Sequence, residues 1–139
     1  MVQERPIVID TNCLLQILSK HSPYRPIWDA FLCKQFILCV SDEILDEYQE
    51  IIEQQTTVQI AENVLMLILN SSNVCYINPH FRLGLITADP DDNKFVDCAF
   101  AGGADFIVSE DAHFNVLKSL PFPTFNVVTM DEFLKKCLP

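Results

Sequence analysis

Glycine is scarce in this sequence, and no long apolar run occurs in it. Only three of the 139 residues are glycine, which excludes a Gly-rich loop of the kind that cradles phosphate groups. The longest dense apolar run, residues 64–69, is far shorter than the roughly 18 to 20 residues of a membrane span. Residues 1–5 lack the charged and apolar regions of a signal peptide. We therefore expect a cytoplasmic protein with no membrane segment.

The six cysteines lack the spacing of a metal site. They form no CxxC pair, and each lies within an apolar segment. Free cysteine behaves as a small buried hydrophobe. The three histidines, His21, His80 and His113, are scattered and lie near no cysteine cluster. We therefore predict buried, reduced thiols in a reducing compartment and no zinc site formed by cysteine.

Basic residues are few, and the formal net charge is −10. Proteins that bind nucleic acid normally present a basic surface, so this charge is unusual for that class. Two origins are open: the acids are spread over solvated helix faces, or several of them are concentrated in one site that bound cations neutralise. The positions of the acids decide between these two.

Short apolar segments alternate with segments of helical periodicity. The predicted strands are residues 7–9, 36–40, 74–77, 106–108 and 125–128, and the predicted helices are 13–18, 27–34, 41–52, 57–69, 95–100, 113–117 and the segment from 129. Each strand is apolar throughout, which is typical of a parallel sheet covered on both faces. We expect one α/β domain over residues 1–139, a three-layer α/β/α sandwich with a central parallel sheet of about five strands.

Capping residues mark two of the predicted helix starts. Ser41 precedes two acids in a first turn, and Thr129 with Glu132 has the spacing of a capping box. The helix over 57–69 is more apolar than the others, and we expect it to be more buried.

Four acids fall where a parallel α/β sheet would bring them to one edge. Asp10 and Asp111 directly follow predicted strands, and the crevice of such a sheet lies at the carboxyl ends of its strands. Glu47 and Asp92 lie on helices that begin just after a strand or turn. Converging carboxylates repel one another unless protons or cations lie between them, and Mg²⁺ prefers oxygen ligands.

Each acid also has a simpler interpretation. Asp10 and Asp111 can cap the helices that follow them. Glu47 can be a solvated helix position, and Asp92 can belong to a solvated acidic face. Each acid taken singly is weak evidence for a metal site. The order of all four along the chain is stronger evidence.

That order resembles the PIN domain family, specifically the small bacterial proteins that are toxins of toxin–antitoxin systems. The resemblance covers nearly the whole chain and is carried by Ile-Val-Ile-Asp-Thr-Asn at 7–12, Ser-Asp-Glu-Ile-Leu-Asp-Glu-Tyr at 41–48, Asp-Pro-Asp-Asp-Asn-Lys-Phe-Val-Asp-Cys-Ala at 89–99 and Ala-Asp-Phe-Ile-Val-Ser-Glu-Asp at 104–111. The last two motifs are the most specific. The resemblance implies an α/β/α sandwich that cleaves single-stranded RNA with Mg²⁺ or Mn²⁺.

The resemblance also assigns roles to individual residues. The catalytic, metal-binding acids of the family match Asp10, Glu47, Asp92 and Asp111. Asn12 and Ser109, otherwise plain turn residues, would hold ligands or the scissile phosphate. Asp97 would be an outer ligand on the helix of Asp92, and it ranks below the four because its i, i+5 offset turns it partly away.

The resulting expectation is a metal-dependent endoribonuclease in which a metal-activated water attacks phosphorus. As a toxin it would have an antitoxin partner, and its relatives are often homodimers. Three alternatives stay open: a non-catalytic PIN-like module that binds RNA or protein, a metal-dependent phosphatase of small phosphate esters, and a structural α/β module with an acidic edge. Against the phosphatase, Asn12 stands where haloacid-dehalogenase-like phosphatases carry a second Asp.

Overall fold

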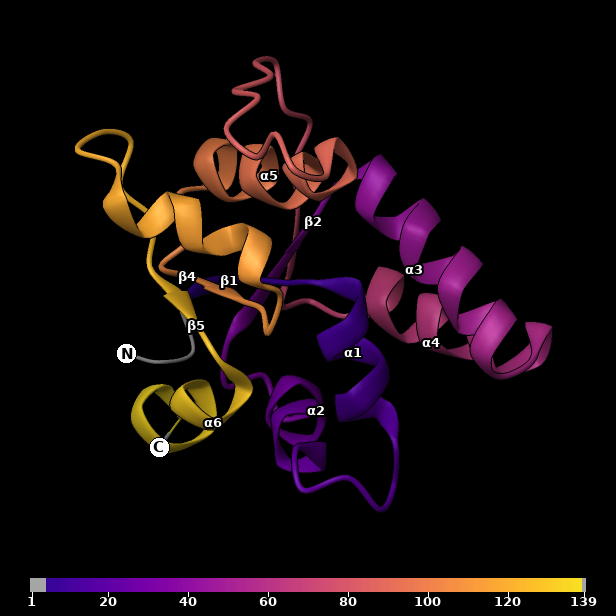
Figure 1. Ribbon diagram of the computed structural model, residues 1–139. Helices are drawn as coiled ribbons and strands as arrows, with labels where there is room; N and C mark the ends of the chain where they lie inside the picture. Colours follow the sequence, from indigo (N-terminus) through magenta and orange to yellow (C-terminus); the bar gives the residue numbers. More distant parts are fainter. Residues whose placement is uncertain (1–4, 139) are drawn as a thin grey trace.

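Five parallel strands form a single sheet in the computed structural model, which describes residues 5–138 (Figure 1). The strands are β1 (Pro6–Ile9), β2 (Ile37–Val40), β3 (Val74–Tyr76), β4 (Phe106–Val108) and β5 (Val127–Val128). Their order is β3-β2-β1-β4-β5, and every neighbouring pair is parallel. The predicted parallel sheet is confirmed, although β5 is shorter than the apolar segment 125–128 suggested.

Helices cover both faces of this sheet. They are α1 (Thr11–Leu18), α2 (Arg25–Leu32), α3 (Asp42–Gln55), α4 (Val58–Asn70), α5 (Asn93–Gly102) and α6 (Met130–Glu132), with the 3-10 segments η2 (Pro90–Asp92) and η3 (Ala112–Ser119) and the π-helical segment η4 (Phe133–Cys137). In Figure 1, α5 lies on one side of the strands and α1, α2 and α6 lie on the other. This arrangement is the expected α/β/α sandwich.

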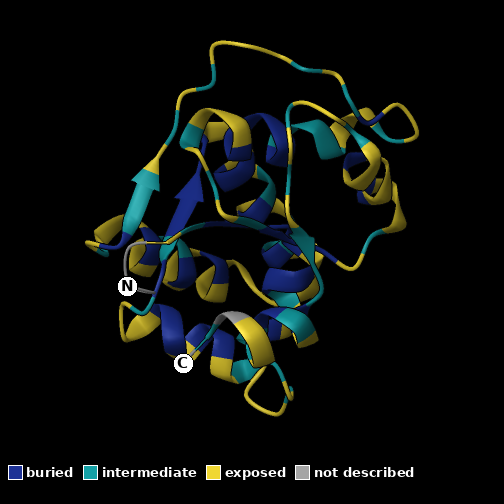
Figure 2. Cartoon of the chain, turned by 90° about the vertical axis from the view of Figure 1, so that its left-hand side faces the viewer, coloured by how far each residue is buried: buried dark blue, intermediate teal, exposed yellow. Residues whose placement is uncertain are grey.

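The central strands β1, β2 and β4 are apolar because both of their faces are covered, whereas the edge strands β3 and β5 are only partly buried or exposed. Ile7, Val8, Leu38 and Ile107 are each at most 1% exposed, although successive side chains in a strand point to opposite faces. Figure 2 shows buried residues on the inner sides of the helices and on one strand, and intermediate burial on the strand beside it. Within the described residues, no helix combines the length and apolarity needed to cross a membrane.

The predicted helix caps are present. The Ser41 hydroxyl accepts a hydrogen bond from the Ile44 amide, and Thr129 and Glu132 form a complete capping box. Gly103 ends α5 with a φ of +60°, a left-handed conformation that glycine adopts without a steric penalty. The local sequence therefore sets where these helices begin and end.

The expectation that the helix over 57–69 is more buried than the others is wrong. Only Ala61, Val64 and Ile68 of α4 are buried, whereas Met66 and Leu69 are more than half exposed. The reason is that α4 packs chiefly against α3, so one stripe of its surface is covered. The high apolar content of α4 therefore includes an apolar face that is exposed to solvent.

The thiols are less uniformly buried than the sequence suggested. Cys13, Cys39 and Cys98 are free and buried, as expected, but Cys33 is exposed and Cys75 is partly exposed. The side chain of Cys137 and the N-terminal residues 1–4 lie outside the described part of the chain.

One buried hydroxyl joins α3 to the end of β1. Tyr48 is fully buried, and its hydroxyl donates a hydrogen bond to the carbonyl oxygen of Ile9. This contact fixes the position of the helix that carries Glu47 relative to the strand that precedes Asp10.

Replacing Tyr48 by Phe should lower the free energy of unfolding by about 1 to 3 kcal/mol, because the Ile9 carbonyl loses its buried donor. Urea denaturation measures this loss. Tyr76→Phe is the matched control, because Tyr76 is 53% exposed and its hydroxyl contacts Asp42 at the surface. Equal losses in the two variants would contradict a special role for the Tyr48 hydrogen bond.

Candidate active site

The site lies beside β1, at the point where the strand order of the sheet changes direction. The chain runs from β1 to β2 on one side of β1, whereas β4 pairs with β1 on the other side. Crevices of parallel α/β sheets form at the carboxyl ends of strands at such a switch point. Ile9 and Val108 are register partners, so the residues that follow them, Asp10 and Ser109, emerge side by side.

Asp10 is the most enclosed of the four predicted acids. It is 5% exposed, and its Oδ1 accepts a hydrogen bond of 2.8 Å from the Cys13 amide, which caps α1. Its Oδ2 accepts a hydrogen bond from the Ser109 hydroxyl. Burial raises the pKa of Asp10, and these two hydrogen bonds partly oppose that rise. The capping interpretation is therefore correct for Asp10, and it does not exclude a second role.

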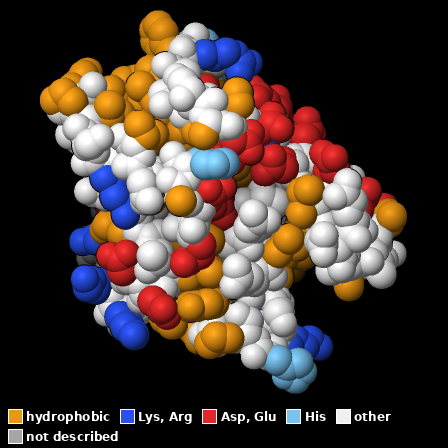
Figure 3. All heavy atoms as spheres, viewed as in Figure 1, with side chains coloured by type: hydrophobic (Ala, Val, Ile, Leu, Met, Phe, Trp, Pro, Cys, Tyr) orange, Lys and Arg blue, Asp and Glu red, His pale blue; other side chains and the backbone are white. Residues whose placement is uncertain are grey.

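An acidic pocket opens above Asp10. It has a volume of about 220 Å³, and its walls include all four predicted acids and Asn12, together with Thr11, Ile51, Asp89, Asp91 and Phe95. Figure 3 shows acidic side chains gathered on this face of the molecule, beside α5 and α3. The structure thus brings together Asp10, Glu47, Asp92 and Asp111 from four separate elements.

Glu47 is held from both sides. Its Oε2 accepts a hydrogen bond from the Thr11 hydroxyl, and its Oε1 lies 2.6 Å from Lys94 Nζ. The Glu47 side chain is only 22% exposed, so it is not the solvated helix position that its residue type suggested. Thr11 and Lys94 were not among the predicted site residues, although each lies inside one of the four motifs.

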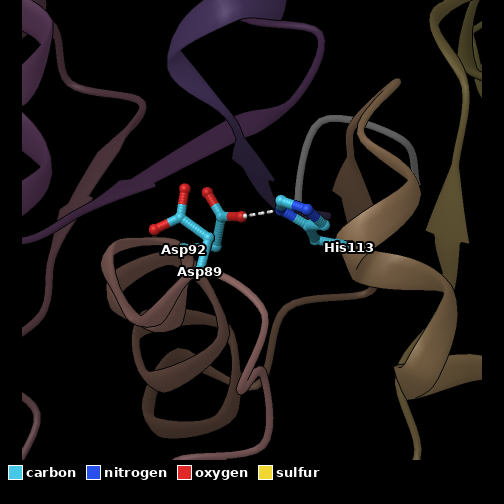
Figure 4. Close-up of side chains that lie close together, drawn as sticks. All are labelled: Asp89, Asp92 and His113. Carbon is cyan, nitrogen blue, oxygen red and sulfur yellow. Dashed lines mark hydrogen bonds and ion pairs between the residues drawn. The ribbon is translucent and has the colours of Figure 1, made fainter.

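His113 is not a lining residue of the acidic pocket, but its imidazole contacts two of the acids that are. Its Nδ1 lies 3.1 Å from Asp92 Oδ2 and 3.4 Å from Asp111 Oδ1 (Figure 4). Burial raises the pKa of Asp92, as do the charges of Asp111 and Asp89, while the hydrogen bond with His113 lowers it. That hydrogen bond in turn raises the pKa of His113. In the sequence His113 is one of three scattered histidines. Its position two residues after Asp111 is the feature that could have identified it as a site residue.

Asp97 does not line the acidic pocket. It is 5% exposed, and its carboxylate accepts a hydrogen bond of 3.0 Å from the Leu83 amide. It lines a different pocket, beside Arg82 and Lys94. The i, i+5 offset from Asp92 explains this placement, and the contact gives Asp97 a role in holding the irregular segment 77–89 against α5.

The residues of the acidic pocket fit a hard divalent cation. Asp10, Asp92 and Asp111 offer carboxylate oxygens, the ligands that Mg²⁺ and Mn²⁺ prefer. The raised pKa values of Asp10 and Asp92 show that negative charge is unfavourable there in the absence of cations. A bound divalent cation would remove that penalty.

The stability of metal-free Asp10→Asn should depend on pH in a defined direction. The folded-state pKa of Asp10 is raised above its ordinary value of 3.8. The stabilising contribution of protonated Asp10 is therefore fully present below pH 3.8. This contribution is lost as the pH rises through the folded-state pKa. Asn stays neutral, so the variant should gain stability relative to wild type between acidic and neutral pH. Urea denaturation in EDTA tests this, and a pH-independent difference would contradict it.

Removing Lys94 should destabilise the metal-free protein because Glu47 loses its counter-charge. We expect Lys94→Met to lower the free energy of unfolding by about 1 to 3 kcal/mol, and by much less in a Glu47→Gln background. Arg82→Met is the control, because the Arg82–Glu43 pair is 78% and 52% exposed and such pairs contribute little. An equal loss in both backgrounds would show that the effect of Lys94 does not pass through Glu47.

One family model and several solved structures match this chain. A family model described as PIN domain matches residues 6–113. VapBC2 from Rickettsia felis, bound to a promoter DNA fragment, is similar with a TM-score of 0.60 and 17% identity over 89% of this chain and 98% of that chain. No curated protein matches the chain in sequence.

Two further solved structures share the fold. Mycobacterium tuberculosis VapC20, a Sarcin-Ricin loop cleaving toxin, has a TM-score of 0.58 and 13% identity over 78% of this chain and 92% of that chain. The PIN domain endonuclease Utp24 has a TM-score of 0.54 and 14% identity over 89% of this chain and 84% of that chain. At these identities the likeness concerns the fold.

Proposed function

The chain belongs to the PIN domain family, and from this premise we propose that it is a metal-dependent endoribonuclease acting on single-stranded RNA. One observation carries the proposal: four acids from separate elements line a single pocket at the switch point of the sheet. The toxin VapC20 and the endonuclease Utp24 share the fold and support nuclease activity. The toxin neighbours favour a role as the toxin of a toxin–antitoxin pair.

Asp10, Asp92 and Asp111 would hold Mg²⁺ or Mn²⁺. Each carboxylate oxygen of Asp10 accepts one hydrogen bond and keeps a further lone pair, so capping α1 and binding a cation are compatible. When bound, the ions would supply Lewis-acid chemistry, polarising the phosphate and making water more acidic.

Other residues of the pocket position the reacting groups. Thr11 and Lys94 hold the Glu47 carboxylate in place, where it can orient the attacking water by a hydrogen bond. Ser109 keeps the Asp10 carboxylate turned toward the pocket. Asn12 is exposed at the pocket wall, where its amide can donate to the scissile phosphate.

A second groove extends the acidic pocket and suits a single nucleic-acid strand. The two share Asp10, Asn12, Ile51 and Asp111, and the groove continues past Gln16 and Gln55 between α1 and α3. Amide side chains can bind sugar and phosphate oxygens without carrying charge. With a net charge of −10, we propose that RNA binding is weak, salt-sensitive and dependent on bound cations.

Two protein partners belong to the proposal. The VapBC2 neighbour is a toxin with its antitoxin, which favours an antitoxin partner for this chain as well. The exposed apolar residues of α4, Met66, Leu67 and Leu69 among them, favour a second copy of the chain as another partner.

Labelled single-stranded RNA should be cut by the purified chain with Mn²⁺ and left intact in EDTA. Asp10→Asn should reduce the rate by at least about 100-fold, since it removes a charge on which cation binding depends. Asp46→Asn is the matched control, because Asp46 is an exposed acid on the same helix as Glu47. All three proteins, wild type and the two variants, are assayed by denaturing gel electrophoresis.

The same proteins separate the alternatives. Mn²⁺ at 100 times its Kd should stabilise wild type by about 2.7 kcal/mol and Asp10→Asn far less. Metal stabilisation without RNA cleavage would overturn the nuclease and favour the binding module. Turnover of a small phosphate ester without RNA cleavage would favour the phosphatase.

A further inference from the structure

An imidazole nitrogen lies among the carboxylates of the acidic pocket. Ligand atoms of Asp89, Asp92 and His113 all lie within 4.8 Å of one another. The two acids come from η2 and the segment just before it, and His113 comes from η3, with its ring turned toward Asp92 (Figure 4). His113 Nδ1 also lies 3.4 Å from Asp111 Oδ1, so it lies between two of the acids that would bind metal.

The distances match those between neighbouring ligands of one ion. Around a six-coordinate ion with bonds of 2.0–2.1 Å, adjacent ligand atoms are roughly 3 Å apart and opposite ones roughly 4.2 Å apart. The separations of His113 Nδ1 from Asp92 Oδ2 and Asp111 Oδ1, 3.1 and 3.4 Å, fall near the first value. Little movement is therefore needed for an ion to replace the hydrogen bond between them.

The backbone holds this histidine in place. The His113 amide donates to Asp111 Oδ1 at 2.9 Å, and the Asp111 amide donates to Ser109 Oγ at 3.0 Å. Ser109 in turn donates to Asp10. Asp89 Oδ1 accepts a hydrogen bond from the Asp91 amide. His113 is thus connected through two short turns to the residue at the base of the pocket.

We propose that His113 is a further ligand of the metal centre, binding through Nδ1, and that it makes the site select a transition-metal ion such as Mn²⁺ over Mg²⁺. The inference rests on the proposed function for the existence of the centre. Mn²⁺ also prefers oxygen ligands, but as a first-row transition-metal ion it accepts an imidazole nitrogen more readily than Mg²⁺, which is bound by oxygen ligands and retains its waters.

The competing role for His113 is that of a counter-cation for Asp92. The two roles predict opposite effects on metal affinity when the imidazole is removed. Loss of a ligand weakens Mn²⁺ binding and leaves Mg²⁺ binding nearly unchanged. Loss of a competing positive charge strengthens the binding of both ions.

The test uses metal-free protein over the whole chain, titrated with Mn²⁺ alone and with Mg²⁺ as competitor while the electron paramagnetic resonance of free Mn²⁺ is recorded. We expect His113→Gln to raise the Kd for Mn²⁺ by about 10-fold or more, with the Kd for Mg²⁺ changed less than about threefold. Electron spin-echo modulation from a coordinated nitrogen should be present in wild type and absent in His113→Gln. His21→Gln, which alters an exposed histidine on a different segment, should retain both properties.

The outcomes distinguish this inference from the proposed function. Mn²⁺ binding without nitrogen modulation, or a parallel change in both affinities, overturns the assignment of His113 and leaves the nuclease untouched. Nitrogen modulation in a protein that cuts no RNA supports the assignment of His113 while the nuclease fails. Complete absence of Mn²⁺ binding by wild type would overturn the metal centre and with it both proposals.

Discussion

The buried carboxylate of Asp10 is the constraint around which the pocket is arranged. A carboxylate that is buried away from water needs hydrogen bonds. The parallel pairing of β1 with β4 supplies one to Asp10 by placing the Ser109 hydroxyl beside it. The amide of Cys13 supplies another, because α1 begins at the next residue. The same hydrogen bonds that make burial tolerable also fix the direction in which Asp10 faces the pocket.

Charge balance in the pocket depends on pairings between distant elements. Glu47 is balanced by Lys94, whereas Asp92 lies against the imidazole of His113. Asp10 has no such partner among the described residues, and burial raises its pKa. The pocket can therefore accept additional positive charge, which would offset part of the formal charge of −10.

Much of the fold could be predicted from local patterns. The central strands are apolar because both of their faces are covered, and that pattern is already visible in the residue types at 7–9 and 106–108. The prediction for α4 failed because composition does not reveal which neighbours a helix has. An apolar helix packed on one side leaves the rest of its apolar surface bare, as Met66 shows.

For the site, local sequence is enough to identify which acids follow strands and which residues cap helices, because both depend on neighbours a few positions away. The partners of the acids depend on tertiary packing: Thr11 meets Glu47 across 36 residues, Lys94 meets it across 47, and His113 meets Asp92 across 21. Packing also places Asp97 against Leu83 and not in the pocket. Periodicity and propensity describe the chain along one helix or strand, whereas such contacts depend on how the elements pack in three dimensions.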